Sequence, residues 1–87
     1  MLHDTITPYI KKLSYPLKEE EELKIVLKRL LTKKEFKIIE YNDAHLSIDE
    51  KLLKLRVDAQ RLDEMQQNLI KKLNYEKNKH QLMQIKE

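Results

Sequence analysis

Apolar side chains recur three and four positions apart along two neighbouring stretches in the second half of the chain, which is the spacing of one helix face. The two sets are Ile48, Leu52 and Leu55, and then Leu62, Met65, Leu69 and Leu73. Only a short break, around Arg56 and Val57, separates them. Two helices joined this closely, the second long and amphipathic, predict a helix-turn-helix over residues 47–73.

Capping residues predict where these helices begin. Thr32 is followed three positions later by Glu35, and Ser47 by Glu50. Each pair has the form of a capping box, in which the two residues satisfy the free amides of a first helical turn. The boxes predict one helix from Thr32 to about residue 41 and another from Ser47 to about residue 55. Asp58 is the expected N-cap of the long helix.

The first third of the chain predicts two supporting helices. One lies within residues 1–15, with Asp4 or Thr5 as its cap and Pro8 in its first turn. The other spans residues 17–31 and opens on four glutamates, residues 19–22. Acidic residues at a helix start complement the helix dipole, so a solvated first turn is the expected role of this run. The alternatives are an acidic docking patch or a divalent-ion site.

The chain has 87 residues, no glycine and no cysteine, and 38 % of its residues are charged. A glycine-free chain rich in Leu, Lys and Glu favours helix and disfavours hairpins. We therefore expect an all-α fold, a small domain of about five helices. Its expected parts are supporting helices over residues 1–31, the helix-turn-helix unit over residues 32–75, and a polar tail or helix extension over residues 76–87.

Composition also bears on function. The start of the chain has no apolar run resembling a signal peptide, and no stretch is long enough to span a membrane, so a cytoplasmic location is expected. Without glycine there is no phosphate-binding loop or nucleophile elbow, so we expect neither an enzyme nor a cofactor. The histidines His3, His45 and His80 match no zinc spacing, so no metal site is expected.

Four short motifs lie between residues 31 and 73: LTKKEFKIIE at residues 31–40, SIDE at 47–50, LRVD at 55–58 and LIKKL at 69–73. Together they resemble the promoter-binding region four of bacterial sigma factors. The string LTKKEFKIIE at residues 31–40 is similar to the family's opening helix, and SIDE at residues 47–50 to the start of its first motif helix. LRVD at residues 55–58 takes the place of the Leu-Gly-Val-Ser turn, and LIKKL at residues 69–73 resembles the end of the second motif helix. The resemblance needs no gap between residues 47 and 73.

This resemblance implies a trihelical DNA-binding fold whose second motif helix enters the major groove of double-stranded DNA. The expected base-reading residues are Gln60, Arg61, Glu64 and Gln67. The expected phosphate-binding residues are Lys33, Lys34, Arg56, Lys71 and Lys72. The chain departs from the family at the turn, where Arg56 replaces a glycine that relieves left-handed backbone strain.

A DNA-binding transcriptional regulator is the first functional hypothesis. A short domain reads few base pairs, so it would gain specificity from a homodimer or from RNA polymerase or another regulator. Leu82, Met83 and Ile85 in the tail are candidates for such a contact. The alternative is a protein-interaction module that has lost DNA affinity, because Asp58, Asp63 and Glu64 place three acids on the groove-facing helix and phosphates repel acids. The net charge of only +3, with no strongly basic block, does not separate the two hypotheses.

Overall fold

The computed structural model describes residues 1–84 of the chain. Within them lie six α-helices and one short 3₁₀ helix, joined in a small all-α domain. The elements are α1 (Leu2–Ile6), η1 (Thr7–Tyr9), α2 (Glu20–Leu30), α3 (Lys33–Asp43), α4 (Ile48–Leu55), α5 (Ala59–Asn74) and α6 (Glu76–Leu82). No helix of these residues has the length and apolar character needed to cross a bilayer.

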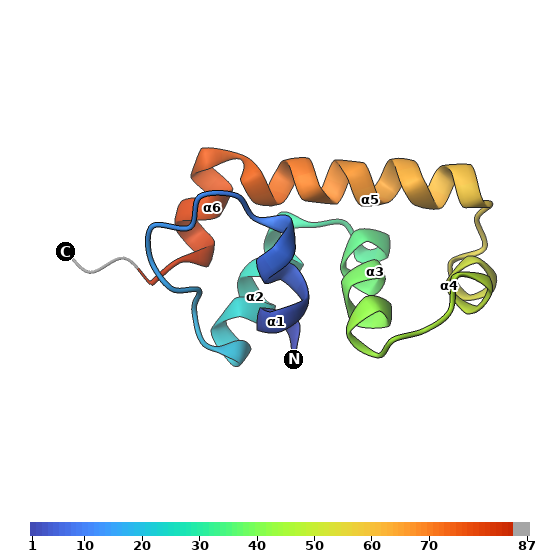
Figure 1. Ribbon diagram of the computed structural model, residues 1–87, viewed down its shortest axis with the longest axis horizontal. Coiled ribbons are helices and arrows are strands. Elements are labelled where there is room, and N and C mark those ends of the chain that lie inside the picture. Colours follow the sequence, from blue (N-terminus) through green and yellow to red (C-terminus); the bar gives the residue numbers. More distant parts are fainter. Residues whose placement is uncertain (85–87) are drawn as a thin grey trace.

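The longest helix, α5, lies along one side of the molecule, with α3, α2 and α1 beneath it and α4 at one end (Figure 1). One apolar core joins all six helices. Its fully buried members include residues from both ends of the chain: Ile6, Leu23, Leu27, Ile38, Ile39, Leu69, Leu73 and Leu82. The supporting helices, the helix-turn-helix and α6 therefore pack as a single unit.

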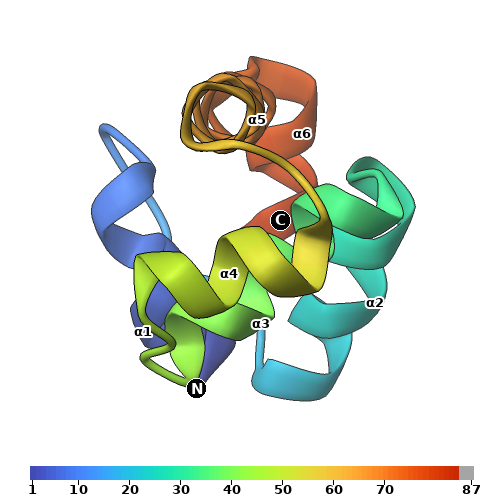
Figure 2. The same cartoon turned by 90° about the vertical axis from the view of Figure 1, so that its right-hand side faces the viewer.

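The helix-turn-helix is present as the sequence predicts. A three-residue connection links α4 to α5, and α4 is seen nearly end-on where α5 lies across the page (Figure 1). After a quarter turn of the view, α4 crosses in front and α5 is end-on (Figure 2). The apolar face of α5 is buried as predicted, at Leu62, Met65, Leu69 and Leu73. Along α4, however, Leu55 is buried while Ile48 stays 62 % exposed.

The predicted caps form with one difference. Thr32 and Glu35 make a complete capping box at the start of α3, and Asp58 accepts a hydrogen bond from the Arg61 amide at the start of α5. At α4, Ser47 accepts from the Glu50 amide at 3.2 Å, but the Glu50 carboxylate is bonded to the Ser47 hydroxyl and not to its backbone. This second box is therefore half formed.

The prediction of one helix within residues 1–15 is wrong in its extent. Helix α1 begins at Leu2, ahead of the proposed caps, and η1 ends at Tyr9. Pro8 lies in the first turn of the 3₁₀ helix and not of an α-helix. The next helix begins at Glu20 and not at residue 17, because Leu17 is extended and bridges Met83.

The interpretation of residues 76–87 as a polar tail or helix extension is also corrected. The backbone of Tyr75 is extended (φ −64°, ψ 128°), which ends α5. Asn78 then donates to the Lys72 carbonyl at 2.9 Å, satisfying one of the acceptors left free at that helix end. Helix α6 turns back over the core, where Leu82 is fully buried and Met83 is 5 % exposed. These two side chains contact their own chain and are not free for a partner; Ile85 lies outside the described residues.

Because α6 completes the core, we expect Leu82→Ala to lower the free energy of unfolding by about 2–5 kcal/mol, the usual cost of removing a buried leucine. Ile48→Ala deletes a similar volume from an exposed position and should change stability by less than about 0.5 kcal/mol. Urea unfolding followed by circular dichroism measures both. Equal effects of the two substitutions would show that α6 does not belong to the core.

Candidate functional site

The outer face of α5 carries the predicted base-reading residues. Helices α3, α4 and α6 and the 3₁₀ helix pack against its other side. The residues expected to contact bases are all exposed: Gln60, Arg61, Glu64 and Gln67. With 16 residues, α5 is about 24 Å long, so it presents a rod of the width and length that a major groove accepts.

Three of these side chains, those of Arg61, Glu64 and Gln67, are engaged on the helix surface. The Arg61 guanidinium lies 3.4 Å from the Glu64 carboxylate, and the Gln67 amide donates to Asp63 at 2.8 Å. Both pairs are solvent-exposed. Exposed pairs of this kind contribute little, about 0–1 kcal/mol, so a ligand can replace them at small cost.

The predicted phosphate-binding cations lie at the two ends of α5 and at the start of α3. Arg56 precedes its first turn, and Lys71 and Lys72 lie in its last. The ammonium of Lys72 is 2.7 Å from the carboxylate of Glu35, near the start of α3. This contact joins α5 to α3, whose first turn carries the exposed Lys33 and Lys34.

Lys72 itself differs from the other cations because it is paired. Glu35 is 5 % exposed, and its carboxylate also accepts from the Thr32 amide at 2.8 Å. Burial raises the pKa of the Glu35 carboxyl, but hydrogen bonds from Lys72 and Thr32 outweigh burial and hold the pKa below its ordinary value of 4.5. The sequence signalled the cap at Thr32 but gave no sign that Glu35 would also hold a lysine of α5.

The turn between α4 and α5 contains a residue in the left-handed conformation, which glycine adopts most easily. Arg56 has φ 57° and ψ 47°. The amide of the next residue, Val57, donates to the Leu52 carbonyl at 3.2 Å, which closes the end of α4. Since a side chain with a Cβ atom is disfavoured in this conformation, the backbone at Arg56 is strained.

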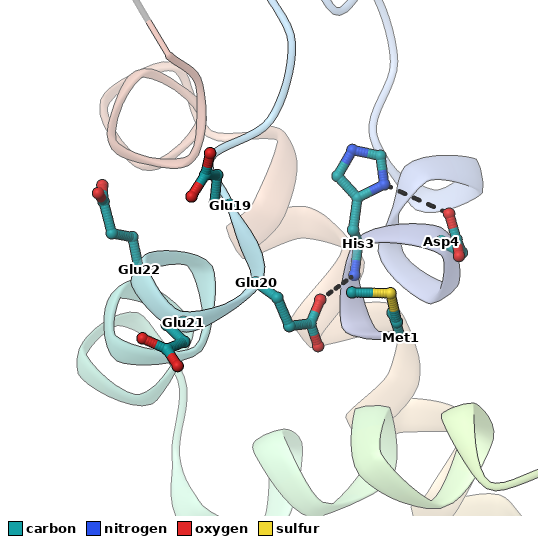
Figure 3. A pocket seen from close by; sticks show the side chains of 7 residues that line it. All are labelled: Met1, His3, Asp4, Glu19, Glu20, Glu21 and Glu22. Atoms are coloured by element: carbon teal, nitrogen blue, oxygen red, sulfur yellow. Dashed lines mark hydrogen bonds and ion pairs between the residues drawn. The ribbon is translucent and has the colours of Figure 1, made fainter.

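The acidic run of residues 19–22 lines a hollow of about 550 Å³ together with Met1, His3 and Asp4 (Figure 3). Glu20 is turned toward α1, where its carboxylate accepts from the amides of Leu2 at 2.8 Å and His3 at 3.1 Å. A glutamate of α2 thus caps α1 from across the chain, which explains why α1 begins before its predicted caps. Among residues 1–84, no three His, Asp or Glu side chains are grouped as metal ligands.

Searches with this chain against protein-family models, curated proteins and solved structures gave no match. The resemblance of residues 32–74 to sigma region four therefore stays a prediction, based on the four motifs that carry it.

Glycine tolerates the left-handed region that costs other residues about 1–2 kcal/mol, but it also loses more chain entropy on folding. When the relief of backbone strain and the larger loss of chain entropy are combined, we expect Arg56→Gly to raise the free energy of unfolding by about 0.5–1 kcal/mol. Lys54→Gly, in the last turn of α4, should lower it by about the same amount. Urea unfolding of both variants tests this, and a loss of stability in Arg56→Gly would show that the turn is not strained.

The Glu35 contacts predict a particular acid response. A carboxyl whose pKa is lower in the folded state stabilises the fold above the unfolded pKa, and this stabilisation is lost as the pH falls through the folded pKa. In Glu35→Gln this loss is absent, so from about pH 4.5 downward its urea midpoint should fall less steeply than that of the wild type. Parallel profiles for wild type and Glu35→Gln would contradict the assignment.

Proposed function

We propose that this protein is a DNA-binding transcriptional regulator whose helix α5 enters the major groove of double-stranded DNA. The observation that carries the proposal is the outer face of α5. It is polar and solvent-exposed at all four predicted base-reading positions, and it follows a three-residue turn. A groove-reading helix needs this accessibility, because base edges are reached only by side chains that project away from the protein core.

The positions of the basic residues also support α5 as the helix that enters the groove. Arg56 lies at one end of α5 and Lys71 near the other, while Lys33 and Lys34 lie in the first turn of the adjacent helix α3. Cations at both ends of a helix that occupies the groove would contact the phosphates on either side of it. Of the acids on the groove face, Asp58 is used as a helix cap, and Glu64 can accept a hydrogen bond from a cytosine amino group.

A second candidate function is a protein-interaction module, with RNA polymerase or another regulator as the partner. Asp63 and Glu64 lie in the middle of the proposed DNA face, and Leu53 on α4 is 80 % exposed. An acidic helix face and an exposed leucine on the preceding helix favour a protein partner over a phosphate backbone. Salt dependence separates the two, because phosphate contacts weaken steeply with salt and apolar contacts do not.

The test is the fluorescence anisotropy of a mixed pool of labelled duplex DNA, titrated at low and near-physiological salt. We expect binding that weakens steeply as salt rises. Lys71→Ala should weaken it and reduce the salt slope by about one unit, and Arg61→Ala should weaken it by about 1–3 kcal/mol.

The matched control is Lys24→Ala, which removes an exposed lysine from α2 and should leave DNA affinity unchanged. If no binding occurs even at low salt, the DNA proposal is wrong and the interaction module takes its place. If Lys24→Ala weakens binding as much as Lys71→Ala does, α5 is not the DNA face.

A further inference from the structure

The outward face of α2 has an isoleucine at its centre. Leu23, Val26 and Leu27 point into the core, and Ile25 lies on the opposite side of the helix, where it is 64 % exposed. Single exposed apolar residues are common on protein surfaces. The order of charges around Ile25, however, is that of a binding surface.

Acids lie one turn before Ile25 and bases one turn after it. Glu21 and Glu22 are four and three residues earlier, and Lys28 and Arg29 are three and four residues later. At 100° per residue, Glu21 and Lys28 fall on one flank of Ile25, and Glu22 and Arg29 fall on the other. The outward face of α2 is therefore self-complementary when it meets a copy of itself running in the opposite direction.

Consider a twofold axis that passes between the two copies of α2 at the level of Ile25 and is perpendicular to both helices. This axis reverses the direction of α2 and keeps each flank on its own side. Glu21 of one copy then lies opposite Lys28 of the other, and Glu22 opposite Arg29. Since the symmetry repeats both contacts, four ion pairs would surround one contact between two isoleucines.

These side chains are accessible. Among the described residues, neither Glu21, Glu22 nor Lys28 forms an ion pair; Lys28 lies 5.6 Å over the ring of Phe36. Glu21 and Glu22 do not share the contact with α1 that engages Glu20 (Figure 3). Arg29 donates to Gln81 at 2.8 Å in an exposed hydrogen bond, which water or a carboxylate can replace.

We propose that the outward face of α2 binds α2 of a second copy in an antiparallel, twofold-symmetric dimer. An 11-residue helix is about 16 Å long, so this contact lies at the small end of specific interfaces, below about 1,200 Å². The dimer is accordingly weak and concentration-dependent, and its reliance on exposed ion pairs makes it sensitive to salt. The proposal does not depend on DNA binding.

Charge reversal tests the pairing. The first variant, E21K/E22K, makes the whole face basic, and the second, K28E/R29E, makes it acidic. In sedimentation velocity at low salt, each variant alone should associate at least roughly tenfold more weakly than the wild type, since four attractive pairs become repulsive. An equimolar mixture should recover association, because the basic face complements the acidic one.

Recovery in the mixture also excludes misfolding as the cause of the loss. The control variant D63K/E64K makes the same change of charge on the exposed face of α5 and should associate like the wild type. A monomeric wild type at millimolar concentration, or a mixture that does not associate, would overturn the proposal. A loss of association in the α5 control would overturn it as well.

The absence of cysteine from the chain allows a second test. Ile25→Cys places two thiols against each other across the twofold axis, where diamide can oxidise them to a disulfide and is itself reduced. We expect the covalent dimer of Ile25→Cys to form faster than that of Leu53→Cys, although Leu53 is more exposed, at 80 % against 64 %. Equal rates would show that collisions, and not a specific α2 contact, link the chains.

Discussion

The position of α5 depends on one buried carboxylate, that of Glu35. An ionised carboxyl withdrawn from water is costly unless it is paired and hydrogen-bonded. Here the amide of Thr32 and the ammonium of Lys72 lie at 2.8 and 2.7 Å. Because one partner belongs to the start of α3 and the other to the end of α5, both contacts form only in a narrow range of placements of the two helices. Apolar packing is non-directional, so the ion pair supplies an alignment that the core alone does not specify.

The absence of glycine shapes the connections between the helices. Within residues 1–84, three residues hold the left-handed conformation that glycine adopts most easily: Lys12, His45 and Arg56. Each lies in a connection between two helical segments, at a cost of about 1–2 kcal/mol that the surrounding contacts must offset. In the turn before α5, the amide of Val57 donates to Leu52, and the burial of Leu55 holds the turn against the core. The chain therefore forms tight helix connections through packing, without the usual residue.

Local signals in the sequence were sufficient for the middle of the chain. The caps at Thr32, Ser47 and Asp58 depend on residues within the next three positions, so their pattern is visible in the sequence itself. The ends of the chain depend on distant contacts. Helix α1 begins where Glu20 caps it from 17 and 18 residues away, and no spacing rule signals such a pair.

The start and the packing of α6 could not be predicted from the sequence for a similar reason. No proline or glycine marks the break at Tyr75. It is stabilised by Asn74, which donates to the Tyr9 carbonyl, and by Asn78, which donates to the Lys72 carbonyl. From the sequence alone, polar side chains of this kind predict a solvated tail, because their hydrogen-bond partners are visible only in the structure. In the candidate site, the exposure of the α5 face followed from its periodicity, whereas the pairing of Lys72 with Glu35 needed the tertiary structure.

The two proposed interfaces use separate surfaces, and this has a consequence for affinity. The outward face of α2 and the outer face of α5 share no residue, so a dimer through α2 would leave both α5 helices accessible. In the proposed DNA complex, Asp63 and Glu64 would weaken the attraction of a single α5 to phosphates. Two copies held on one duplex would offset that loss, because the second copy binds at the high effective concentration set by the first. Since the α2 ion pairs and the phosphate contacts both weaken with salt, occupancy of DNA by the dimer would fall more steeply with salt than that of either chain alone.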